Sequence, residues 1–188
     1  MAADQNLTAM NNKDKNLQLE QSIVGNSELG EDMQQFLTFI LAGEEYGVDI
    51  LRVQEIKGWD AVTQVPNTPE YVRGVINLRG TIVPIIDLRI RFNMEQLEYG
   101  PTTVVIVLKV MSDEDNSRIM GVVVDGVSDV YNIKNEEISP SPDFGEGVDS
   151  SFVKGLATVE EKMVILLDID HMLNSNELAS INKMADED

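Results

Sequence analysis

The chain has 188 residues, no cysteine and a formal net charge of −19, from 14 basic and 33 acidic residues. The lack of cysteine excludes a disulfide framework and thiolate chemistry, and it fits a reducing compartment. The acidic balance argues against binding to nucleic acid or to anionic membrane surfaces, because both depend on lysine and arginine. No secretory signal and no apolar run of membrane-spanning length is recognisable, so we expect a cytoplasmic protein without membrane insertion.

The two ends of the chain differ in composition from its middle. Residues 1–33 are rich in Asn, Gln, Asp and Glu and show no sustained apolar period, which predicts a disordered tail. A folded domain is expected over residues 34–173. Residues 174–188 are expected to form a C-terminal helix with an acidic end, in which Asn174 and Glu177 resemble a capping box.

The folded part begins with strand signals. The run "QFLTFIL" is typical of a strand, and "AGEEYGV" turns the chain into a second short strand. The next segment, "DILRVQEIKG", is predicted to form a helix of two turns, because Ile50, Val53 and Ile56 recur at helical spacing. Asp49 can cap this helix and Gly58 can end it.

The middle of the chain carries more strand signals. "YVRGVINLRGTIVPIIDLRIRF" predicts a hairpin with Arg79 and Gly80 at its tip, and "TTVVIVLKV" predicts a strand. After the polar loop 112–117, residues 118–133 should contain at least one strand, with a break near Asp125. Residues 139–147 are a turn-rich loop.

An internal repeat is the most informative feature. "FVKGLATVEEKMVILLDIDHML" matches the hairpin segment without a gap at a spacing of 81 residues, from Tyr71 to Phe152. A second match, between "YGVDILRVQEI" and "MGVVVDGVSDV", has a spacing of 74 residues, from Gly47 to Gly121. The repeat predicts two strand-rich halves that form two small barrels side by side. At the position that corresponds to Arg79, the second copy has Glu160.

Catalytic motifs are not recognisable. His171 is the single histidine, and no phosphate-binding glycine loop is present. We therefore expect no enzymatic activity, no metal and no cofactor. A hydrolase that uses carboxylates alone would leave little local signature, so that alternative stays open.

Four segments resemble, in order and spacing, the signature stretches of the CheW family of chemotaxis coupling proteins: "GEEYGVDILRVQEIKG", "NTPEYVRGVINLRGTIVPIIDLR", "TTVVIVL" and "GVVVDGVSDV". The resemblance implies a mainly β fold of two SH3-like, five-stranded β-barrels that share a core, with short helices and a C-terminal helix. It also implies a non-enzymatic adaptor in two-component signal transduction, which couples transmembrane chemoreceptors (methyl-accepting chemotaxis proteins) to the CheA histidine kinase. Such a protein is cytoplasmic and associates with receptor arrays at the inner membrane face.

The resemblance also implies two sets of contact residues. The cytoplasmic receptor tip would contact a groove between the barrels, at Val53, Glu55, Arg79, Val127 and Val130. The kinase regulatory domain would contact Leu78, Ile82, Val104, Val105 and Phe144. Val104 and Val105 would point to opposite faces of one strand, so at most one of them should be a surface contact.

Among these residues Arg79 is the strongest candidate. A basic side chain beside a glycine at a hairpin tip has little structural role, because an exposed ion pair contributes only about 0–1 kcal/mol. The glutamate at the corresponding position of the repeat indicates that the fold tolerates either charge. Two other functions are left open: an adaptor of a non-flagellar chemosensory pathway, such as type IV pilus control, and an oligonucleotide-binding small barrel.

Overall fold

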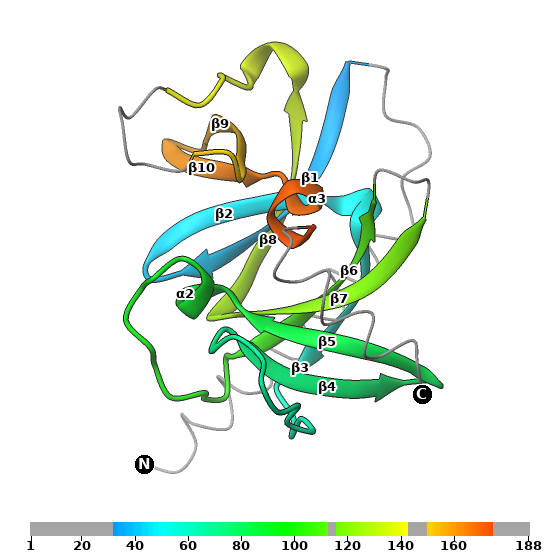
Figure 1. Cartoon of the computed structure of the whole chain (residues 1–188). Coiled ribbons are helices and arrows are strands. Elements are labelled where there is room, and N and C mark those ends of the chain that lie inside the picture. Colours follow the sequence, from blue (N-terminus) through cyan, green and yellow to red (C-terminus); the bar gives the residue numbers. More distant parts are fainter. Residues whose placement is uncertain (1–31, 113–115, 143–149, 175–188) are drawn as a thin grey trace, which may run out of the picture.

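The computed structural model describes residues 32–112, 116–142 and 150–174. Within these ranges the chain forms ten strands and four short helices (Figure 1). The strands are β1 (Met33–Leu41), β2 (Glu44–Asp49), β3 (Val53–Gly58), β4 (Val72–Leu78), β5 (Thr81–Asp87), β6 (Val104–Met111), β7 (Ser117–Val124), β8 (Gly126–Lys134), β9 (Val153–Val159) and β10 (Lys162–Leu167). The helices are η1 (Ile50–Arg52), α2 (Leu88–Arg91), η2 (Asn135–Glu137) and α3 (Ile169–Leu173).

The strands form two five-stranded sheets, which we call barrel 1 and barrel 2. Barrel 1 has the strand order β3-β6-β7-β5-β4, and barrel 2 has the order β8-β1-β2-β10-β9. The prediction of a mainly β fold with two five-stranded barrels is confirmed. The chain is not divided at one point between them, however. Strands β1 and β2 complete barrel 2, so the expectation that each contiguous half forms one barrel is wrong.

The sequence repeat corresponds to equivalent places in the two barrels. Parallel pairing places Ile85 of β5 opposite Gly121 of β7, and it places Leu166 of β10 opposite Gly47 of β2. A Cβ atom at Gly121 would lie 2.6 Å from Ile85 Cδ1, and one at Gly47 would lie 2.9 Å from Leu166 Cδ2. At both glycines a larger side chain of the neighbouring strand occupies the space that a Cβ atom would need.

A repeated aspartate begins a short helix in each barrel. Asp87 Oδ1 accepts a hydrogen bond from the amide of Ile90 at 3.2 Å, which caps α2. Asp168 Oδ1 accepts one from the amide of His171 at 3.0 Å, which caps α3. A carboxylate that accepts an orphan amide at a helix start stabilises that end, so the identity of these positions has a local structural cause.

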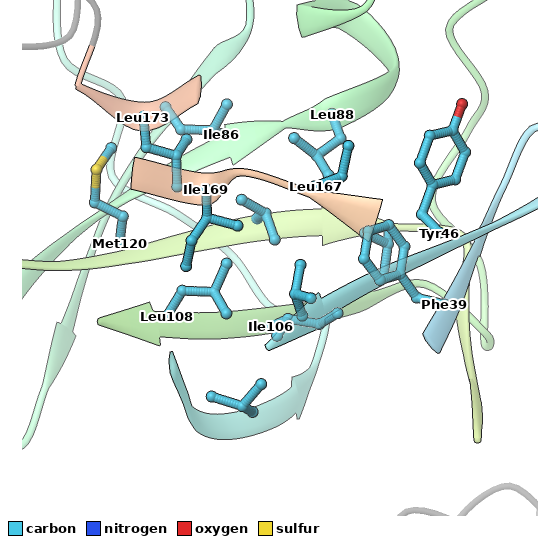
Figure 2. Close-up of a cluster of buried hydrophobic side chains, with 14 of the residues drawn as sticks. Phe39, Tyr46, Ile86, Leu88, Ile106, Leu108, Met120, Leu167, Ile169 and Leu173 are labelled. Atoms are coloured by element: carbon cyan, nitrogen blue, oxygen red, sulfur yellow. The ribbon is translucent and has the colours of Figure 1, made fainter. Parts of the chain in front are cut away.

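The largest hydrophobic cluster lies between the barrels. Figure 2 shows its side chains converging from strands of both sheets and from α3. Strand β6 is buried on both faces: Ile106 and Leu108 belong to this shared core, whereas Val105 and Val107 fill the interior of barrel 1. A smaller cluster around Phe36 fills the interior of barrel 2. The near-continuous apolar runs of the central strands follow from this burial on two faces.

The predicted helix over residues 49–58 is wrong. Only η1 is helical, and the chain then continues as β3, which pairs with β6. A register shift between Val53 and Glu55 allows Val53 and Ile56 to face the core although they are three positions apart. The three-residue spacing of these apolar side chains, which resembles that of a helix, is therefore a consequence of the bulge in β3. The capping role of Asp49 is confirmed, since its Oδ1 accepts a hydrogen bond from the amide of Leu51 at 3.0 Å.

The predicted domain limits can be compared only in part. Met33, which was assigned to the tail, is the first residue of β1. Residues 1–31 and the expected helix beyond Asn174 lie outside the described residues. Asn174 itself ends α3, and its side chain donates to the carbonyl of Met111 at 2.6 Å and accepts a bond from Arg118 at 2.9 Å. These bonds fasten the end of α3 to barrel 1.

A second polar link joins the barrels beside this one. Arg52 forms two hydrogen bonds with the carboxylate of Asp170 in α3, at 2.9 and 2.8 Å. The same carboxylate accepts the amide of Met111 at 2.8 Å. A planar guanidinium that meets both oxygens of a carboxylate fixes its orientation as well as its distance. The relative position of the barrels is therefore set by directed bonds as well as by the shared core.

Candidate protein-binding surfaces

The tip of the β4–β5 hairpin is the most prominent candidate surface. Arg79 and Gly80 both have positive φ, at 50° and 89°, as two-residue hairpin turns require. The amide of Gly80 donates to Asn77 Oδ1 at 2.8 Å, and the side chain of Arg79 is 78% exposed. In the β9–β10 hairpin, which lies on the opposite side of the molecule in Figure 1, Glu160 occupies the same place with φ of 50°.

The structure brings together two of the predicted receptor-contact residues. Arg79 Nη2 lies 2.8 Å from Glu55 Oε2, although Glu55 is in β3 and Arg79 is in the turn between β4 and β5. Arg79 therefore has a partner within the chain, which the sequence did not indicate. The Glu55 side chain is 25% exposed, so the pair is open to solvent and contributes only about 0–1 kcal/mol. A partner protein could replace Glu55 at little cost to the fold.

The predicted receptor-contact valines differ in exposure. Val127 and Val130 of β8 are partly buried and pack against the shared core. Val53, which corresponds to Val127 in the repeat, is buried in that core. Its side chain is therefore not accessible at the surface in this structure.

The predicted kinase-contact residues also divide into accessible and buried ones. Ile82 is 45% exposed, and Leu78 is partly buried against the interior of barrel 1. Val104 and Val105 point to opposite faces, as expected, but both are buried: Val104 in the shared core and Val105 in the interior of barrel 1. The expectation that one of them could face a partner does not fit a strand covered on both faces. Phe144 lies outside the described residues.

Sequence reasoning missed one exposed apolar residue that the repeat could have revealed. Met163 is 60% exposed and corresponds to Ile82 at the spacing of 81 residues. Each hairpin therefore carries one exposed apolar side chain close to its tip, next to a basic residue in barrel 1 and to an acidic residue in barrel 2. The sequence signal was that Ile82 and Met163, both apolar, occupy equivalent positions of the repeat.

Several polar side chains that line a small cavity beside Asp87 are paired with one another or with other residues of the chain. This cavity, of about 170 Å³, is lined in part by Asp87, Tyr99 and Asp125. Tyr99 donates to Asp87 Oδ2 at 2.5 Å, and burial, together with this bond, raises the pKa of Tyr99. Asp125 is bound by Arg89 at 2.6 Å. Among the described residues no group of three side chains is arranged to hold a metal ion, and no helix has the length and apolarity needed to cross a bilayer.

The described part of the chain forms two linked barrels with small cavities. Its two exposed hairpin tips carry opposite charges, so the distinctive side chains of this β scaffold lie at its surface. The chain belongs to the CheW family of chemotaxis scaffold proteins: the CheW-like domain matches residues 35–177. It is 48% identical over 152 residues to the chemotaxis protein CheW of Klebsiella aerogenes, which covers 81% of this chain and 89% of that protein. It is 36% identical to CheW of Rhizobium meliloti, over 77% of this chain and 90% of the relative.

A solved structure agrees with the fold. The crystal structure of the scaffolding protein TtCheW from Thermoanaerobacter tengcongensis superposes with a TM-score of 0.68 at 33% sequence identity. The match covers 77% of this chain and 94% of that protein. The family is therefore supported by both sequence and structure, and the oligonucleotide-binding barrel loses its support.

Proposed function

We propose that this protein is a non-enzymatic adaptor that couples the cytoplasmic tips of chemoreceptors to the regulatory domain of a CheA histidine kinase. The observation that carries the proposal is the 48% identity to a chemotaxis protein CheW over nearly the whole length of that protein. The adaptor would act in the cytoplasm, in receptor arrays at the inner membrane face. Its chemistry would be recognition only: two partners held by one rigid body gain effective concentration and a fixed geometry.

The receptor surface would consist of the accessible members of the predicted set, which are Glu55, Arg79, Val127 and Val130. The first two supply an exposed ion pair, and the valines supply partly buried apolar area. A carboxylate or carbonyl on the receptor could take the place of Glu55 beside Arg79. The guanidinium would then keep its charge pairing while a new interface forms around it.

The kinase surface would lie on the same hairpin. Leu78 pairs with Thr81 across the turn, and Ile82 pairs with Asn77, so both apolar residues flank the tip that carries Arg79. Phe144 would add an aromatic contact from the turn-rich loop 139–147. The receptor and the kinase would thus contact neighbouring parts of the β4–β5 hairpin, so the two partners would be bound close together.

We expect Ile82→Ser to weaken binding of the kinase regulatory domain by about 1–1.5 kcal/mol, because about half of an isoleucine side chain remains to be buried in the complex. That change corresponds to roughly five- to twelvefold in affinity. Met163→Ser at the equivalent place of barrel 2 is the matched control, and it should leave this affinity unchanged. Titration calorimetry with the purified kinase domain measures both values.

The same titration tests the proposed function. Saturable one-to-one binding of the regulatory domain by the parent protein supports it. Absence of binding to any CheA regulatory domain, with the protein folded, would refute the kinase part of the proposal. Equal losses for the two serine variants would show that the barrel 1 hairpin is not the kinase surface.

A further inference from the structure

Barrel 2 holds a buried carboxylate oxygen without a hydrogen-bond partner. Glu45 of β2 is only 7% exposed, and its Oε1 atom is buried and forms no hydrogen bond within the described part of the chain. Tyr46 and Val48 of the same strand face the shared core. Because side chains alternate along a strand, Glu45 shares the other face with Gly47, whose Cβ position meets Phe36, Val164 and Leu166 in the interior of barrel 2.

Glu45 pairs with Val164 of β10, and Val164 belongs to the interior cluster that Tyr131 packs against. Tyr131 packs against the interior cluster of barrel 2, and its hydroxyl lies 3.5 Å from Glu160 Oε2. Burial raises the pKa of Tyr131, and the negative charges of Glu45, Glu160 and Asp129 raise it further. We call these four residues the acidic site. All three carboxylates are close enough to affect one phenol.

No basic side chain of the described residues forms an ion pair with the acidic site. The ion pairs join Arg52 to Asp170, Arg79 to Glu55 and Arg89 to Asp125. Lys154 is the cation associated with the interior of barrel 2, but its Nζ lies over the ring of Phe36 at 6.0 Å and donates to Gln34 at 3.4 Å. The negative charge of the site is therefore not balanced by these contacts.

The fold itself does not require an acid at this position. In barrel 1 the residue that corresponds to Glu45 at the spacing of 74 is Ile119, which packs against the interior cluster of that barrel. Burying a carboxylate oxygen without a hydrogen-bond partner is unfavourable, whereas an apolar residue here would contribute to stability. The carboxylate therefore points to an interaction that the isolated chain does not make.

We propose that the acidic site binds an alkylammonium group. An ammonium has three N–H donors, and the site offers three acceptors: Glu45 Oε1, the Glu160 carboxylate and the Tyr131 hydroxyl oxygen. The hydrogen bond between Tyr131 and Glu160 is at the long limit of 3.5 Å, so both groups can accept a new partner at little cost. The ammonium comes either from a lysine of a partner protein or from a small amine. The site lies on barrel 2, apart from the hairpin proposed above for the kinase.

The test uses butylammonium chloride as the probe and the full-length, nitrogen-15-labelled protein. We expect saturable shifts of the backbone amide resonances of Glu45, Tyr131 and Glu160, and no such shifts with sodium chloride at equal ionic strength. Glu45→Gln should weaken binding of the probe at least tenfold, because a charge-assisted hydrogen bond is lost. Glu44→Gln, at the neighbouring exposed glutamate, is the matched control and should bind like the parent.

Two results would overturn the proposal. One is a shift that never saturates, or that saturates equally in Glu45→Gln. The other is a clear fall in the melting temperature of Glu45→Gln relative to Glu44→Gln, since that would show that the carboxylate is already satisfied inside the fold. Competition between butylammonium and the kinase domain or a receptor fragment would place the ammonium on that partner, and saturable binding without competition would assign the site to a small amine.

Discussion

Gly74→Val is expected to destabilise the protein by about 2–6 kcal/mol, from backbone strain and overpacking together. Gly74 has φ of 143°, which side chains with a Cβ rarely adopt. A Cβ atom would lie 2.3 Å from the carbonyl oxygen of Thr63. That carbonyl accepts the amide of Val75 at 2.8 Å, and the amide of Thr63 donates back to Val75 at 2.9 Å. The valine would therefore separate a paired segment from the edge of β4.

Gly155→Val should have a smaller effect, of about 1–3 kcal/mol, because only overpacking is involved. A Cβ atom there would lie 2.7 Å from Ile138 Cγ2 and 2.9 Å from the carbonyl oxygen of Ser139. Gly58→Val is the matched control, since Gly58 is also in a strand and has open space around its Cβ position. Urea denaturation gives the three free energies of unfolding. If Gly74→Val unfolds like Gly58→Val, the close approach seen here is not important for stability.

Arg79→Glu is expected to reduce binding and to change folding little. The ion pair with Glu55 is exposed, so its loss should alter the free energy of unfolding by no more than about 1 kcal/mol. In a desolvated interface, removal of one member of a charged pair costs roughly 2–5 kcal/mol. That range corresponds to about 30-fold to several thousandfold in affinity. Thermal melts and titrations with receptor fragments and the kinase regulatory domain measure the two effects separately.

Glu161→Arg is the control for this charge reversal, because Glu161 is an exposed residue at the tip of the barrel 2 hairpin and the change alters the charge by the same amount. It should leave both affinities near those of the parent. An Arg79→Glu protein that folds normally and binds both partners with unchanged affinity would show that Arg79 is only a solvated turn residue. Equal losses from both reversals would indicate a general effect of net charge instead of a contact.

The fold could be predicted from the sequence where local pattern and tertiary structure agree. The repeat placed Gly47 and Gly121, and Asp87 and Asp168, at equivalent positions, and the structure gives each pair the same role. The failures have a common cause. Strands β1 and β2 belong to barrel 2 instead of barrel 1, and strand β3 contains a bulge. Pairing between distant segments of the chain decides both features. The helical spacing of Val53 and Ile56 could not reveal that bulge.

The candidate surfaces were predictable to a smaller extent. A tight turn with positive φ explains why Arg79 is exposed, and this could be inferred from the neighbouring glycine. Its pairing with Glu55 could not, because β3 and β4 lie at the two ends of the strand order of barrel 1. The burial of both Val104 and Val105 was indicated by the long apolar run of β6, which is typical of a strand covered on two faces.

Bridging of receptor and kinase is the central claim, and sedimentation tests it most directly. Membranes that contain a methyl-accepting chemoreceptor are mixed with purified CheA, with and without this protein, and the kinase in the pellet is measured. We expect the kinase to sediment with the membranes when this protein is present and to sediment little without it. Kinase sedimentation that is the same in both samples, with all components folded, would contradict the proposed adaptor function.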